Sequence, residues 1–86
     1  MLTLEDCLAL CELTREEIDA IAEHEHLPET LAMEMGEYLV HTVDGQKRIR
    51  RMIEDDIAEA QSRGDHRHSA ALKLALKHFC EYHKDA

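Results

Sequence analysis

Acidic and histidine side chains at helical spacings are the residues of this chain that could do chemistry. In the third predicted helix, Glu34, Glu37 and His41 follow one another at intervals of three and four residues, which places them on one stripe. Carboxylates and imidazoles are the donors of transition-metal sites in helical bundles. If Asp56 and His68 join the stripe from two other helices, the five residues predict a site for a divalent transition metal.

The same stripe has a structural interpretation. It departs from the Glu-x-x-His pairs that carboxylate-bridged bundles place on two helices. A solvated flank of an acidic helix accounts for Glu34 and Glu37, and His41 near the helix C-terminus would complement the helix dipole. Metal binding is therefore the alternative function. The sequence predicts no cofactor other than a divalent transition metal at this stripe.

A second group of donors is Glu23-His24-Glu25-His26, just before Pro28. In a helix the two histidines lie about 200° apart, so they cannot chelate one ion together. Each could join a site built with other elements or subunits. A solvated helix end explains the group as well.

The three cysteines are an odd number and lack a C-x-x-C spacing, so they predict neither a disulfide framework nor a thioredoxin-like site. Cys7 and Cys11 are one helical turn apart and could share a soft metal with Cys80. All three also lie on apolar faces, where a thiol packs as a small hydrophobic group. Cysteines without a disulfide pattern are typical of a protein in the reducing cytoplasm, where we place this chain. We expect no secretory signal.

Cations gather near the start of the longest predicted helix. The basic cluster consists of Lys47, Arg48, Arg50 and Arg51. Positive charge opposes the helix dipole at this end. Pairing with Glu54 and Asp55, four residues further on, compensates weakly. An acidic partner, either another protein or a second copy of this chain, compensates better. The net charge of −9 and the absence of interleaved aromatics argue against nucleic acid.

Asp56 interrupts an apolar helix face between Ile49, Ile53 and Ala60. A buried carboxylate has to be paired, hydrogen-bonded or protonated. We expect a structural pair with a cation or histidine of another helix, or a position in a subunit interface. A neutral, unpaired acid is the remaining case, and it would destabilise the fold as the pH rises.

Five helices position these groups. Capping boxes are predicted at Thr3 with Asp6 and at Thr14 with Glu17, and caps at Thr42 and Asp65. The expected helices run over about Leu4–Glu12, Arg15–Glu25, Pro28–His41, the Thr42–Gly64 stretch and His66–Tyr82. In the third, the predicted inner stripe is Leu31, Met35, Tyr38 and Leu39. A close helix–helix approach would explain Gly36 in its interior.

The sequence therefore predicts an all-α fold, a small antiparallel bundle of about five helices in which residues 1–86 form one domain. We expect the last three helices to form the main bundle, with the first two across it. No apolar run approaches the length of a membrane span. The sequence contains neither a nucleophile constellation nor a glycine-rich phosphate loop, so neither of these signals of an enzyme is present. With a thin core, the chain is expected to be an acidic cytoplasmic protein that acts by protein–protein binding, as a homo-oligomeric regulatory or accessory subunit.

Overall fold

The computed structural model describes residues 3, 6 and 11–86. In this part of the chain there are four helices and no strand, which confirms the all-α class. The helices are α2 (Arg15–Glu25), α3 (Glu29–Val40), α4 (Val43–Ser62) and α5 (His66–Tyr82). The predicted helix over residues 4–12 lies mostly outside the described residues. Its capping box is formed, because the backbone N–H of Asp6 donates to Thr3 Oγ1 and that of Thr3 donates to Asp6 Oδ2, each at 3.1 Å.

Side-chain caps mark the starts of α2, α4 and α5. Both halves of the predicted box are present at α2, where Thr14 and Glu17 each accept a hydrogen bond from the other's backbone N–H. Thr42 Oγ1 accepts from the backbone N–H of Gly45 at the start of α4. Asp65 Oδ1 accepts from that of His68 at the start of α5. Each cap satisfies an N–H group that the helix itself leaves without a partner.

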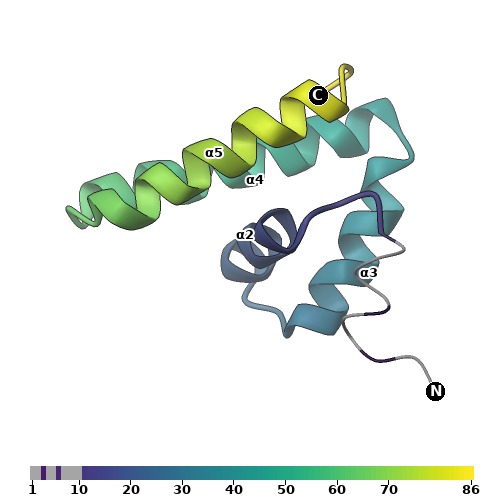
Figure 1. Ribbon diagram of the computed structural model, residues 1–86, viewed down its shortest axis with the longest axis horizontal. Coiled ribbons are helices and arrows are strands. Elements are labelled where there is room, and N and C mark those ends of the chain that lie inside the picture. The colour runs from purple at the N-terminus through teal and green to yellow at the C-terminus, as the bar shows by residue number, and fades with distance from the viewer. Residues whose placement is uncertain (1–2, 4–5, 7–10) are drawn as a thin grey trace.

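The long helices α4 and α5 form an antiparallel hairpin joined by a short turn (Figure 1). Helices α2 and α3 pack toward one end of this hairpin, and the end that carries the turn projects beyond them (Figure 1). We expected the last three helices to form the main bundle. Instead α2 and α4 each pack against the other three described helices, whereas α3 and α5 each pack mainly against α2 and α4. The structure therefore centres on α4 together with α2.

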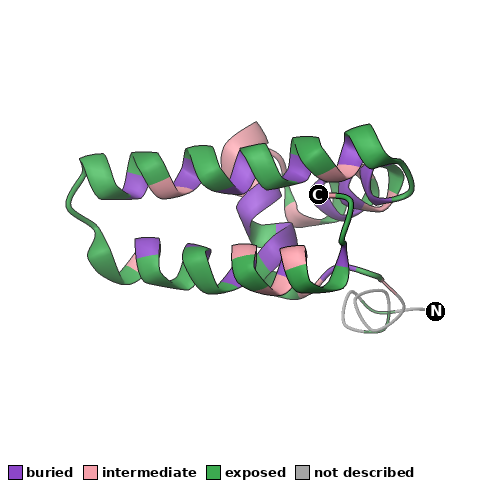
Figure 2. Cartoon of the chain, turned by 90° about the horizontal axis from the view of Figure 1, so that it is seen from above, coloured by how far each residue is buried: buried purple, intermediate pink, exposed green. Residues whose placement is uncertain are grey.

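Isoleucine side chains and one phenylalanine make up the middle of the core. Ile18 and Ile21 of α2 and Ile49 and Ile53 of α4 are fully buried, as is Phe79 of α5. The buried faces of the helices turn toward one another, and the exposed faces turn outward (Figure 2). Within the described part of the chain, no helix combines the length and the apolar character needed to cross a membrane.

The buried face of α3 differs from the predicted one. Leu31 is 48% exposed and Tyr38 is 79% exposed, so of the predicted stripe only Leu39 is buried. The buried residues of α3 are Ala32, Met33, Gly36, Leu39 and Val40. Apolar residues surround this helix on most sides, so their period does not determine which side packs against α2 and α4.

Gly36 lies where α3 approaches α2, as its position in the helix interior suggested. A Cβ atom at this residue would overlap the side chain of Leu13 and would lie 3.1 Å from Ile21 Cδ1. The absence of a side chain therefore lets the two helices approach closely.

Candidate binding site between helices α2, α4 and α5

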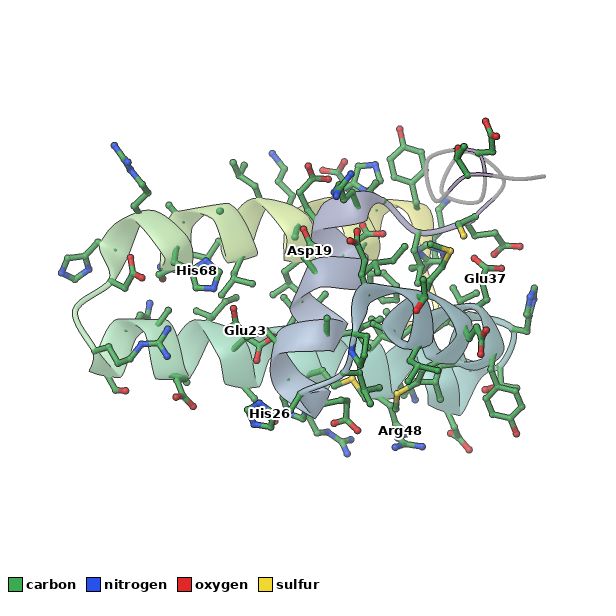
Figure 3. The ribbon with its side chains drawn as sticks, turned by 90° about the horizontal axis from the view of Figure 1, so that it is seen from below. Asp19, Glu23, His26, Glu37, Arg48 and His68 are labelled. Atoms are coloured by element: carbon green, nitrogen blue, oxygen red, sulfur yellow. The ribbon has the colours of Figure 1, made fainter. Side chains whose placement is uncertain are left out.

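The last turns of α2 bring acidic and histidine side chains against α4 and α5. His68 Nε2 donates to Glu23 Oε1 at 2.5 Å, and these two side chains point toward each other from α5 and α2 (Figure 3). His24 Nε2 donates to Asp55 Oδ2 at 3.0 Å. With Asp56, whose charge interacts with Glu23, His24 and His68, these residues form what we call the acid–histidine cluster. Its members are Glu23, His24, Asp55, Asp56 and His68.

His24 carries hydrogen bonds on both ring nitrogens. Its Nδ1 lies 2.7 Å from Glu25 Oε2, and its Nε2 bonds to Asp55. Two carboxylate acceptors favour the imidazolium, in which both nitrogens donate. Burial by itself lowers the pKa of His24, but the hydrogen bonds to Glu25 and Asp55 outweigh it, and the pKa is raised above its usual value.

Asp56 is buried without the pairing that we expected. The residue is 5% exposed, and its Oδ2 is buried with no hydrogen-bond partner in the described part of the chain. Burial raises the pKa of Asp56 to about 7, and the charge of Glu23 adds to the shift. His24 and His68 lower the pKa by less than these causes raise it. The geometry thus corresponds to the case of an unpaired carboxylic acid that keeps its proton up to a pH of about 7.

A polar cavity of about 250 Å³ opens beside Asp56. We call it the acidic pit. Its lining residues are Glu23, His24, His26, Asp55, Asp56, Glu59 and Arg63. The Arg63 guanidinium pairs with Glu59 across 3.4 Å. Carboxyl groups from α2 and α4 therefore surround a space that holds one arginine at its edge.

A second hollow, of about 220 Å³, runs between α2 and α5. We call it the α2–α5 groove. Its apolar lining comes from Ala20, Ala71, Leu72 and Ala75, and its acidic rim from Glu16, Asp19 and Glu23, with His68 at the end shared with the cluster. Partial burial and the charge of Glu29 raise the pKa of Asp19, while Arg15 lowers it. The groove thus offers an apolar surface bordered by negative charge.

The structure does not assemble the five predicted metal ligands. Asp56 and His68 belong to the acid–histidine cluster, but Glu37 lies at the other end of the molecule from His68 (Figure 3). Glu37 accepts from the backbone N–H of Glu12 and lies 3.9 Å from His41 Nε2. Among the described residues, no group of three or more histidine, cysteine or acidic side chains is arranged to hold a metal ion.

The reason lies in the placement of α3. This helix packs against α2 and α4 and presents Glu34 to solvent. The predicted stripe therefore remains on the outside of the molecule, as in its structural interpretation. Of the predicted soft-metal set, Cys11 and Cys80 are half-buried, and Cys7 lies outside the described residues.

All four residues of the basic cluster are exposed. Arg50 pairs with Glu54 across 3.5 Å, as predicted, and donates to the carbonyl of Ala86. The predicted pairing of Arg51 with Asp55 is not formed, because Asp55 bonds to His24. Within the described part of the chain, no ion pair engages Lys47, Arg48 or Arg51. Three cations are therefore available to a partner.

Comparison of the chain with protein-family models, with curated proteins and with solved structures finds no match. The function has to be inferred from the two hollows and from the distribution of charge around them.

Proposed function

We propose that the protein acts by protein–protein binding, as a homo-oligomeric regulatory or accessory subunit, and that the α2–α5 groove of one copy binds the basic cluster of another. The observation that supports this proposal is that one chain carries both an apolar groove with an acidic rim and an exposed basic cluster, three of whose cations have no ion pair among the described residues. Opposite charges on two such surfaces steer association and fix its register.

The α4 surface that carries the cations also offers an apolar side chain. Val43 is 48% exposed and lies one turn before Lys47, and Arg50 and Arg51 follow one turn later. These residues share one side of the helix. Val43 would contact the alanine-rich floor of the groove, while the cations would meet the rim at Glu16 and Asp19.

The groove and the basic cluster are different surfaces, so the contact between copies is heterologous. Repetition of such a contact closes into a ring or extends into a filament, depending on the rotation between copies. Association would also stabilise a chain of this size. A small domain buries only a modest part of its apolar surface on its own, and a contact between copies buries more.

Two charge-reversed variants test the proposal. Asp19→Lys damages the groove, and Arg51→Glu damages the basic cluster. Light scattering at micromolar concentration should give a mass above the 9.9 kDa chain for the wild type and a monomer for each variant. An equimolar mixture should form a dimer and nothing larger, because each variant retains the surface that the other lacks.

The matched controls are Glu34→Lys and Lys73→Glu, which make the same charge changes at exposed residues outside both surfaces. Both should associate as the wild type does. Circular dichroism verifies that every variant is folded. A wild type that stays monomeric would overturn the self-association, and variants that still associate separately would overturn the assignment of the two surfaces.

A further inference from the structure

Asp56 presents a buried hydrogen-bond acceptor beside the acidic pit. Its residue is 95% removed from solvent, and Oδ2 has no donor among the described residues. An unsatisfied buried polar atom costs free energy. The side chain also lines the cavity, so a ligand in the pit can approach it. The site therefore calls for a group that donates hydrogen bonds.

The charges around the pit specify the sign of that group. Glu23 comes from α2, and Asp55, Asp56 and Glu59 come from α4. The basic side chains that face them are His24, His26 and Arg63 on the lining, with His68 bonded to Glu23 from α5. When the carboxyl groups are ionised, the acids outnumber the permanent cation by four to one, so the pit attracts a cation.

The size and spacing of the pit specify the class of cation. A cavity of about 250 Å³ is far larger than a bare metal ion needs, and no three donors in the described part of the chain converge as metal ligands do. A planar guanidinium has five N–H donors in a rigid fork and bonds to carboxylates that lie apart from one another.

Arg63 supports this choice. Its guanidinium already lies on Glu59 at the edge of the pit, at 3.4 Å, while its side chain remains 52% exposed. The pit therefore accepts this chemical group at its rim, and the deeper acceptor on Asp56 is left for another.

From these contacts we infer that the acidic pit is a binding site for an alkylguanidinium cation, with Asp56 as the buried acceptor and Glu23, Asp55 and Glu59 around it. The cation comes either from a small molecule or from an arginine side chain of a partner protein. Binding replaces a proton on Asp56 with the guanidinium, because the ionised carboxylate is the better acceptor. Affinity should therefore rise as the pH rises through neutrality.

Calorimetry in a Lys47→Glu background tests the inference independently of self-association, because this change damages the basic cluster at a residue that, unlike Arg51, does not line a hollow with His24 and Asp55. The first probe is n-butylguanidinium, and the second is the acetylated, amidated tripeptide Ala-Arg-Ala. Binding of the first alone indicates a small-molecule ligand. Tighter binding of the second indicates a partner's arginine. Either result supports the site, and a stronger interaction at pH 8 than at pH 6 is expected for both.

Three further substitutions locate the binding. Asp56→Asn should weaken binding about tenfold or more, which is the worth of a hydrogen bond between charged groups. Arg63→Ala should strengthen it by removing the competing guanidinium. Glu54→Gln, an exposed acid on the same helix that does not line the pit, should leave it unchanged.

Three outcomes would overturn the inference. The first is the absence of binding by both probes at millimolar concentration, and the second is equal binding by the wild-type and Asp56→Asn pits. The third is stoichiometric binding of Zn²⁺ or Mn²⁺ in place of both probes, which would make the cluster a metal site. Urea melts of each variant verify that the protein used is folded.

Discussion

His78 of α5 donates from Nδ1 to Oε2 of Glu17 on α2 across 2.7 Å, and this bond joins two residues that are 61 positions apart. Glu17 is fully buried, and its other oxygen accepts from the backbone N–H of Thr14 at 2.9 Å. One carboxylate thus caps α2 and ties it to α5. The groove between these helices depends on that connection.

We predict that Glu17→Ala destabilises the protein by about 2–3 kcal/mol, because the change removes a cap and leaves His78 without its acceptor. The figure is below that of a fully buried pair, since His78 is 42% exposed at its side chain and solvent screens the interaction. Urea denaturation measures the difference. Glu16→Ala, at the exposed neighbouring residue, should change the stability by no more than about 0.5 kcal/mol. Equal losses in the two variants would contradict the prediction.

The raised pKa of Asp56 predicts that stability falls as the pH rises. The carboxyl group titrates at about 7 in the folded state and near 3.8 in the unfolded chain. Between these values the folded state holds a proton that the unfolded state has released, so the free energy of unfolding decreases with increasing pH. Each unit of pKa shift is worth about 1.4 kcal/mol. The loss should level off above pH 7.

Asp56→Asn should remove this contribution. The variant should exceed the wild type in stability at pH 8 and should come closest to it near pH 3, where Asp56 is protonated in both states. His24 also has a raised pKa and loses its contribution as the pH climbs above 6.5, and because the charge of Asp56 adds to that shift, the loss at His24 should be smaller in the variant. Urea melts at six pH values between 3 and 8 measure the difference. Parallel curves for the two proteins would show that Asp56 is solvated.

Gly45 marks a close approach between the backbones of α3 and α4. It occupies the first turn of α4, and a Cβ atom there would overlap the carbonyl oxygen of Leu39. Backbone atoms cannot yield as a side chain does, so Gly45→Ala should cost about 3 kcal/mol or more. Gly36→Ala, whose added methyl meets the end of the Leu13 side chain, should cost less. Thermal melts by circular dichroism rank the two, and the reverse order would contradict the reading of the α3–α4 junction.

His26 ends α2 in a left-handed conformation with φ of 55°. Glycine adopts this conformation without the steric penalty of a Cβ atom. We predict that His26→Gly raises stability by about 1 kcal/mol. The control is His41→Gly at the end of α3, where φ is −81° and glycine offers no such relief. A loss of stability in His26→Gly would show that the side chain contributes more through its contacts than the strain costs.

Local signals made the helices predictable. Arg15–Glu25 and His66–Tyr82 match the expected ranges, and α3 and α4 differ from theirs by one or two residues at each end. Caps explain this accuracy at the starts of α2, α4 and α5, because each cap involves residues only three positions apart. At α3 the signal is Pro28, which stands just before the first helical residue. The buried face of α3 was not predictable in the same way. Leu31 and Tyr38 are as apolar as the residues that are buried, and the position of α2 decides between them.

The candidate site was predictable in part. Asp56 and His68 are recognisable in the sequence because each places a polar group on or beside an apolar helix face. Both belong to the acid–histidine cluster. Glu23 and His24 are candidate metal donors in the sequence, but a solvated helix end explains them equally well. Their contacts with His68 and Asp55 span 45 and 31 residues. No local pattern encodes which helix crosses another at that point.

The turn between α4 and α5 lies at the projecting end of the hairpin, and no atom lies within 4 Å of a Cβ built at Gly64. A loop in such a setting tolerates insertion. A fluorescent protein inserted between Gly64 and Asp65, with Asp65 kept as the cap of α5, would lie at the end of the α4–α5 hairpin, away from the core. The hairpin thus offers a mounting point for a reporter that leaves the opposite end of the molecule undisturbed.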